Sequence, residues 1–172
     1  MAYLVVHPID ASALLTQVHS PERGGTACFI GTVRDHHHGR SVLRLEYSAY
    51  APMAEAECGR ILAEAESRWD VVVALQHRIG QLAIGETAVA VAAASAHRGD
   101  AFLGCRYVIE EVKRRVPIWK REIYADGSIV WVDPSAGGED PSVIARGHGP
   151  RRNLTISATQ GIASAPAGPR ND

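Results

Sequence analysis

The residues best suited to chemistry lie in one short basic stretch, 113–122, with the sequence KRRVPIWKRE. Half of its ten residues are permanently cationic, whereas the whole chain of 172 residues has a formal net charge of -1. Because like charges repel, such a cluster favours a site that binds an anion. Lys113 and Lys120 flank Pro117, where a helix is expected to end near Val116 and an extended segment to begin. The sequence therefore predicts a corner at which both lysines converge on one pocket.

Two further groups of polar residues are candidates for the same kind of site. Arg34 and the histidines at 36–38 follow a predicted strand, and His97 and Arg98 fall where a strand meets the start of a helix. A helix N-terminus beside an arginine and a histidine favours negative charge. A nearby lysine can act as an acid, a base or a nucleophile when its surroundings lower its pKa. Phosphate recognition combined with lysine chemistry is thus one coherent function.

The same cations also fit purely structural roles. Arg114 and Arg115 fall in the last turn of the predicted helix, where the helix dipole favours cations whatever the function, and this is the better explanation for both. For Lys113 the two explanations carry equal weight. Lys120 also fits the solvent-facing side of an alternating strand, and Glu122 fits an ion pair with a basic neighbour.

Several other candidates have simple alternatives. His97 also fits a cap at the start of the helix, while Phe29, Phe102 and Met53 are expected in the core. The run at 36–38 offers three imidazoles, but adjacent residues on a loop form a poor metal cage. No cysteine or carboxylate spacing supports one, so neither a metal nor a cofactor is expected.

The elements that must position these groups mix strands and helices without a strict βαβ order, which favours the α+β class with a mostly antiparallel sheet. The segment 42–50 alternates, with Leu43, Leu45 and Tyr47 on one face, and is expected to pair antiparallel with the strand 26–33. Helices are predicted at 10–18, 53–69 and 100–116, and further strands at 3–7, 70–79, 86–95 and 118–124. An exposed connection is expected at 35–41, a turn between Gly80 and Gly85, and a hairpin turn at Asp126–Gly127.

Length and composition point to one domain, residues 1–133, followed by a Gly/Pro/Ala-rich and flexible tail at 134–172. The near-neutral charge argues against nucleic-acid or membrane binding by the surface as a whole. The first apolar run is too short for a signal peptide, and none approaches the roughly 20 residues of a membrane span. The chain has three cysteines without a Cys-x-x-Cys pair, which favours reduced, buried thiols in a cytoplasmic protein.

Five fragments, in order and covering about 25–131, resemble the large, catalytic subunit of molybdopterin synthase. The fragments are FIGTVR (29–34), LEYSAYAPMAE (45–55), HRIGQLAIGE (77–86), SAHR (95–98) and VKRRVPIWKRE (112–122). The resemblance implies an α/β hammerhead fold and a homodimer. It also implies a small ubiquitin-like sulfur carrier on each copy, which makes a heterotetramer. The carrier's C-terminal Gly-Gly, as a thiocarboxylate, would deliver two sulfurs to cyclic pyranopterin monophosphate and form the dithiolene of molybdopterin.

The resemblance also assigns residues. It implies that Lys113 and Lys120 are catalytic and that Arg34, His97 and Arg98 bind the substrate and its phosphate. It further implies a pocket lined by Phe29, Met53 and Glu122. It gives no role to the histidines at 36–38, and the divergent tail leaves the basic residues after 145 without one.

Two other function classes are consistent with parts of the sequence. A non-catalytic module that binds a ubiquitin-like partner would use the basic corner only for docking, yet docking alone needs no phosphate pocket. An RNA-binding protein would need a broader positive field and exposed aromatic residues, and only 6% of the residues are aromatic.

Overall fold

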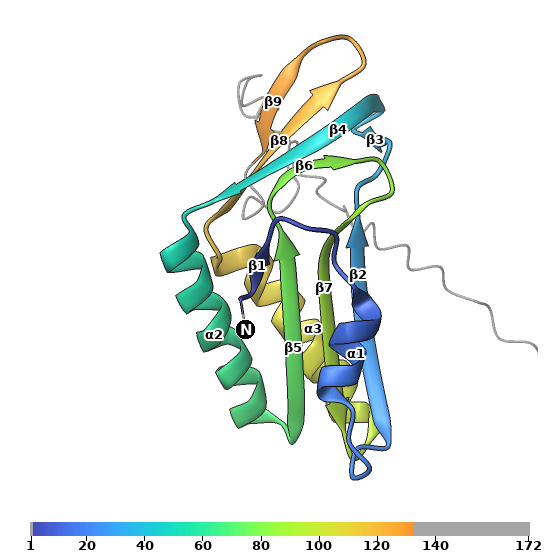
Figure 1. The fold of residues 1–172 in the computed structure, drawn as a ribbon, viewed down its shortest axis with the longest axis vertical. Coiled ribbons are helices and arrows are strands. Elements are labelled where there is room, and N and C mark those ends of the chain that lie inside the picture. The colour runs from blue at the N-terminus through green and yellow to red at the C-terminus, as the bar shows by residue number, and fades with distance from the viewer. Residues whose placement is uncertain (1, 133–172) are drawn as a thin grey trace, which may run out of the picture.

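The computed structural model describes residues 2–132, in which three helices pack against two β-sheets (Figure 1). The predicted tail, 134–172, lies outside the described residues. The α+β class, the mostly antiparallel pairing and the two long helices are confirmed. In chain order the elements are β1 (Leu4–Val5), α1 (Ala11–Val18), β2 (Gly25–Thr32), β3 (His36–His37), β4 (Arg40–Ala49), α2 (Ala51–Arg68), β5 (Val71–Arg78), β6 (Gly80–Ala83), β7 (Thr87–Ser95), α3 (Arg98–Arg115), β8 (Ile118–Tyr124) and β9 (Ile129–Val132).

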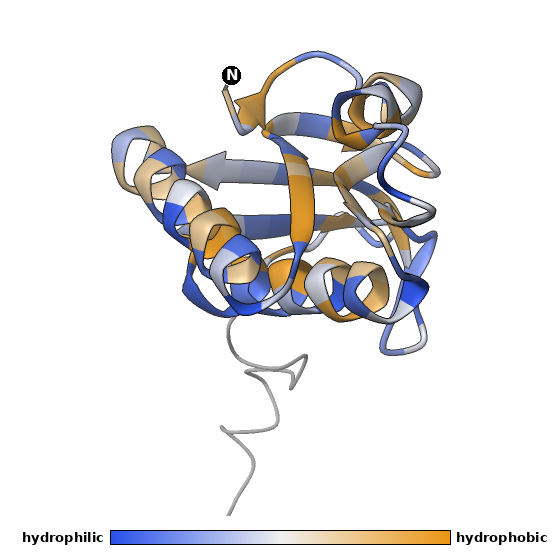
Figure 2. Cartoon of the chain, turned by 90° about the horizontal axis from the view of Figure 1, so that it is seen from below, coloured by the Kyte–Doolittle hydropathy of each residue, from blue (hydrophilic) through white to orange (hydrophobic). Residues whose placement is uncertain are grey.

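The first sheet has the strand order β1-β5-β7-β2, in which β1 and β5 are parallel and the other pairs antiparallel. The interior strand β7 is buried on both faces. Ala90 and Ala92 belong to the core under α1, whereas Val89 and Val91 belong to the larger core formed with α2 and α3. Helices on both faces explain why this strand is continuously apolar instead of alternating. The helices themselves mix hydrophobic and hydrophilic residues (Figure 2), and within 2–132 none is both long and apolar enough to cross a membrane.

The helix ends follow from local sequence. Asp10 caps α1, because its carboxylate accepts hydrogen bonds from the backbone N–H groups of Ser12 and Ala13. Pro52 lies in the first turn of α2, where its missing N–H costs nothing. The α3 helix ends as predicted, with Val116 as its C-cap directly before Pro117.

The second sheet corrects the predicted strand pairing. Its order is β3-β4-β8-β9, with β6 also paired to β4. The expected pair of 26–33 with 42–50 is wrong, since β2 pairs with β7 and β4 pairs with β8 and β6. A two-residue turn with positive φ at His38 and Gly39 instead places β3 beside β4. The predicted exposed connection and the turn at 80–85 therefore each contain a short strand.

A β-bulge explains a second error, in β4. The register shifts between Val42 and Arg44, so the alternation reverses at that point. Val42 is buried, although it falls out of phase with the predicted apolar face, and Leu43 is 55% exposed. The predicted face therefore begins only at Leu45, which is buried.

Three core predictions were also wrong. Phe102 is 64% exposed beside a cavity between α3 and β2, and Met53 is 55% exposed in the first turn of α2. Cys28 is exposed on the edge strand β2, whereas Cys58 and Cys105 are free and buried as expected. Phe29 is half-buried and packs against the edge of the larger core.

Candidate active site

The end of α3 and the start of β8 form one wall of a cavity of about 630 Å³, here called the cationic pocket. Lys113 reaches it from the last turn of the helix, and Lys120 from the strand beyond Pro117. Arg34, which follows β2, joins them. The predicted corner therefore does bring both lysines to one cavity. They are also the only two lysines in the sequence, since every other permanent cation is an arginine.

Lys120 is held by a buried carboxylate. Its Nζ lies 2.8 Å from Oε1 of Glu122, whose side chain is 2% exposed. Oε2 of the same carboxylate accepts hydrogen bonds from Nδ1 of His37, at 2.8 Å, and from the hydroxyl of Tyr124. Burial raises the pKa of Glu122, but the hydrogen bonds from Lys120 and Tyr124 outweigh that effect and leave it below the usual value. The alternative of a solvent-facing Lys120 is wrong, since its side chain is only 18% exposed.

His77 on β5 was not among the predicted site residues, although it lines the cationic pocket. Its Nδ1 lies 3.0 Å from the carbonyl oxygen of Arg78, so Nδ1 carries the proton and Nε2 keeps its lone pair. Burial is the main cause, and the charge of Lys113 a smaller one, of a pKa for His77 that is lowered to about 4. Tyr47 packs edge-on against this ring, with centroids 5.1 Å apart, and burial followed by the charge of Glu122 raises the pKa of Tyr47 to about 12. Both groups are therefore neutral at ordinary pH.

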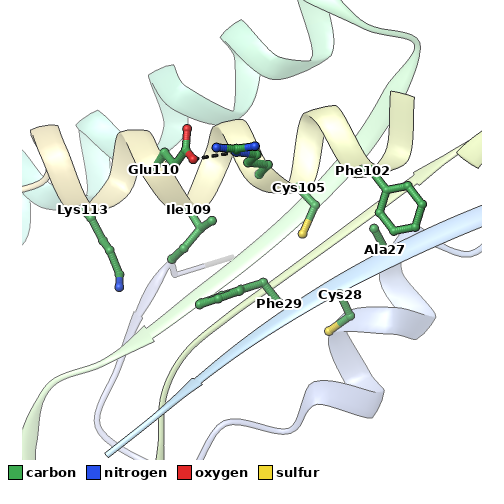
Figure 3. A pocket seen from close by; sticks show the side chains of 9 residues that line it. Ala27, Cys28, Phe29, Phe102, Cys105, Ile109, Glu110 and Lys113 are labelled. Atoms are coloured by element: carbon green, nitrogen blue, oxygen red, sulfur yellow. Dashed lines mark hydrogen bonds and ion pairs between the residues drawn. The ribbon is translucent and has the colours of Figure 1, made fainter. Parts of the chain in front are cut away.

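A second cavity of about 460 Å³, the apolar groove, runs between α3 and the edge strand β2 (Figure 3). Phe29 and Cys28 line it from the strand, and Cys105 and Ile109 line it from the helix. Lys113 extends from the helix at one end of this groove (Figure 3) and also lines the cationic pocket. Its amine therefore lies where the apolar groove meets the cationic pocket.

Of the two arginines next to Lys113, Arg115 points away from the cationic pocket, whereas Arg114 lines its rim. Arg115 donates hydrogen bonds to Glu57 and Glu64 of α2, each at 2.6 Å, and to Glu111 of its own helix at 3.2 Å. Arg114 pairs with Glu111 and is 65% exposed. By contrast, Lys113 forms no ion pair within residues 2–132, which leaves its amine available.

The remaining predicted site residues lie elsewhere. His97 and Arg98 are exposed at the start of α3 and line neither cavity. Lys113 follows Arg98 by 15 residues in one helix, which corresponds to about 22 Å along its axis. The ring of His97 makes no capping hydrogen bond, so the structural alternative for it is wrong. Met53 is exposed in the first turn of α2, outside both cavities.

The histidine run does not assemble a metal site. His36 pairs with Asp35 at 2.6 Å and His37 with Glu122. Across the part of the chain that the structure describes, no three His, Cys, Asp or Glu side chains are grouped so that they could hold a metal ion.

The chain matches a known protein family over most of the described residues. The family described as "MoaE protein" matches residues 4–115. The chain belongs to this family. It is 46% identical over 121 residues to the molybdopterin synthase catalytic subunit of Bacillus subtilis, covering 70% of this chain and 77% of that protein. It is 42% identical over 130 residues to the Arabidopsis thaliana catalytic subunit, covering 75% of this chain and 65% of that longer protein.

Solved structures agree with this assignment. The crystal structure of molybdopterin synthase from Staphylococcus aureus has a TM-score of 0.73 and 36% identity, covering 76% of this chain and 96% of that one. A complex of subunits 1 and 2 of molybdopterin-converting factor from Helicobacter pylori matches with a TM-score of 0.64 at 19% identity, which supports the fold alone. The resemblance drawn from the five sequence fragments is confirmed, and with it the expectation of a molybdopterin synthase catalytic subunit.

Proposed function

We propose that this chain transfers sulfur from the C-terminal thiocarboxylate of a small ubiquitin-like carrier to cyclic pyranopterin monophosphate, and so forms the dithiolene of molybdopterin. The observation that carries the proposal is the position of Lys113, which lines both the apolar groove and the cationic pocket. A sulfur donor arriving along the groove and a phosphate-bearing acceptor in the pocket would meet at this amine.

The apolar groove suits the carrier's tail. Terminal glycines lack side chains, so an extended Gly-Gly segment fits between a helix and a strand where larger residues do not. Phe29 and Ile109 would exclude water around it, and the anionic thiocarboxylate would face the ammonium of Lys113. The Helicobacter complex of subunits 1 and 2 is consistent with such a small partner.

The cationic pocket suits the acceptor. The pocket is lined by four cationic side chains, those of Arg34, Lys113, Arg114 and Lys120. Its volume of about 630 Å³ lies within the range of cavities that bind small ligands. Lys113, which forms no ion pair in the described part of the chain, would serve as acid, base or transient covalent partner at the reacting carbon. Lys120, held by Glu122, would orient the substrate and stabilise the negative charge that develops during sulfur transfer.

His97 and Arg98 require a second copy if they bind the same substrate. They lie at the opposite end of α3 from Lys113, too far for one small molecule to contact both within one chain. A homodimer that brings the start of one α3 to the end of the other would complete the phosphate site. With one carrier bound to each copy, the assembly is a heterotetramer, and we expect it to act in the cytoplasm.

The decisive experiment combines the purified chain, thiocarboxylated carrier and cyclic pyranopterin monophosphate, and follows molybdopterin as its fluorescent oxidation product. Lys113→Ala should reduce product at least about a thousandfold, as expected when a group at the reacting atoms is lost. Carrier affinity should stay within about threefold, because the apolar lining of the groove is unchanged. Arg60→Ala, which removes an exposed cation on α2, is the matched control and should be fully active.

Two results would contradict the proposal. Near-normal product from Lys113→Ala would exclude the proposed role of this amine. Tight carrier binding by the natural chain without any product would favour the alternative, a non-catalytic module that only docks a ubiquitin-like partner.

A further inference from the structure

The three adjacent histidines have three different environments. They lie on the hairpin formed by β3 and β4, whose turn is His38–Gly39. His36 is 67% exposed and, among residues 2–132, pairs only with its neighbour Asp35, and His38 occupies the turn itself. His37 alone is directed into the cationic pocket, with 15% of its side chain exposed. The hairpin therefore delivers one imidazole to the candidate active site.

The partner of this imidazole is the carboxylate that holds Lys120. Glu122 uses Oε1 for the ammonium of Lys120 and Oε2 for His37 and Tyr124. With three donors on its two oxygens and 2% of its side chain exposed, it has little surface left for a substrate. The geometry thus changes its expected role from lining the pocket to holding a lysine.

Anchoring both ends of the carboxylate has a mechanical consequence. A carboxylate bound only by Lys120 would rotate about its terminal torsion, and the flexible lysine stem would follow it. The bonds from His37 and Tyr124 fix Oε2, so Oε1 stays turned toward Lys120. Catalytic groups must be held to within about half an ångström of their working positions.

We propose that His37 is a positioning residue for sulfur transfer, which acts through Glu122 to hold the amine of Lys120 at the cationic pocket. The inference rests on the proposed function for its catalytic meaning. The linkage of His37, Glu122 and Lys120 stands on geometry alone and can be tested separately.

The kinetic test uses the reconstituted complex with three variants. His37→Phe keeps an aromatic ring but removes the donor to Glu122, and should lower kcat roughly 10- to 100-fold, as for loss of a hydrogen bond to a charged group. KM for the substrate should change less than about threefold, because the pocket keeps its cations. His37→Asn places an amide N–H near the position of Nδ1 and should restore kcat to within about threefold of the natural chain. His36→Phe, one residue away and outside the pocket, should have no effect.

The structural test exploits the presence of only two lysines. In a sample labelled at the lysine side chains, two sets of NMR signals are expected, which Lys113→Arg assigns. His37→Phe should shift and broaden the Lys120 signals and leave those of Lys113 in place, and His37→Asn should return them. This readout needs no turnover, so it remains decisive if the natural chain makes no product and the proposed function fails.

Several outcomes would overturn the proposal. These are unchanged Lys120 signals in His37→Phe, a kcat for that variant equal to that of the natural chain, or equal defects in His37→Phe and His37→Asn. A fall in melting temperature of His37→Phe that accounts for its lost activity would also count against it, because His37 would then support folding and not position Lys120.

Discussion

The two lysines of the cationic pocket differ in what surrounds them, and this difference separates their roles. Lys120 forms an ion pair with the buried Glu122, which holds its amine in place. Lys113 has no carboxylate partner within 2–132 and lies near the buried, neutral ring of His77. A stationary cation suits electrostatic stabilisation, whereas an amine without a counter-ion suits proton transfer or covalent chemistry.

The buried ring of His77 should make stability depend on pH. Its pKa is about 4 in the folded chain and about 6.5 when exposed, so the unfolded state binds the extra proton first. Above pH 6.5 His77 is neutral in both states and costs no stability. As the pH drops toward 4, protonation of His77 in the unfolded state lowers the free energy of unfolding by roughly 3 kcal/mol in total. His77→Asn lacks this titration and should lose that much less stability over the same range. Urea unfolding of both proteins at several pH values measures the difference.

A histidine on the surface provides the control for that prediction. His19→Asn removes an imidazole that is exposed just after α1, so its unfolding curves should follow those of the natural chain. If the natural chain and His77→Asn lost stability in parallel between pH 6.5 and 4, His77 would not be buried as a neutral group.

At the scale of single residues, the sequence predicted where the cationic side chains lie better than it predicted which groups contact them. Pro117 marks the corner, and the two lysines flank it, so their convergence followed from local rules. The contact of His37 with Glu122 could not be predicted from local rules, because the two residues lie 85 positions apart in sequence. Nor could local patterns show that His77 faces a cavity, since a histidine in an apolar strand fits a solvent-facing position equally well.

At the scale of elements, helices were predicted more accurately than strand pairing. Helix boundaries depend on nearby residues such as the Asp10 cap and Pro117, which can be identified directly in the sequence. Strand pairing depends on contacts between distant segments, so nothing local in β2 shows that its partner is β7. The bulge at Leu43 was missed for a related reason, because a one-residue insertion reverses the alternation without changing composition.

The long helices are joined by Arg115, and this junction can be tested with a neighbouring residue as the control. Arg115→Ala removes hydrogen bonds to two carboxylates of α2, which leaves Glu57 with Arg60 and Glu64 with Tyr107. We expect a loss of about 2 kcal/mol in the free energy of unfolding, which lowers the melting temperature by several degrees. Arg114→Ala removes one exposed pair within α3 and should change stability by less than about 0.5 kcal/mol. Chemical denaturation of both variants makes the comparison.

The result also bears on function. Both variants keep Lys113, so equal stability losses, or a large loss only in Arg114→Ala, would contradict the structural role given to Arg115. A clear loss of sulfur transfer in Arg115→Ala would trace to the position of the end of α3, since the side chain itself points to α2 and not to the cationic pocket.

At the scale of the whole molecule, one helix separates the two halves of the expected phosphate site. The start of α3 carries His97 and Arg98, its end carries Lys113, and the chain alone cannot bring them to one substrate. The sequence motifs identified both halves, and the helix predicted at 100–116 already lies between them. That separation follows from the continuous 18-residue helix and is the strongest structural reason to expect a working dimer.

Mixing two inactive variants tests whether the site is shared between copies. If Lys113 of one copy works with His97 and Arg98 of the other, a dimer of Lys113→Ala with the double variant His97→Ala/Arg98→Ala contains one intact site and one doubly defective site. After subunits exchange at random, about half of the dimers are mixed, so activity should return to roughly a quarter of that of the natural protein. If every site lay within one copy, the mixture would stay inactive. If His97 and Arg98 had no role in turnover, the double variant would already be active alone. Product formation after co-incubation under exchange conditions, with each variant alone as the baseline, therefore decides whether the dimer is part of the catalytic machinery or only its scaffold.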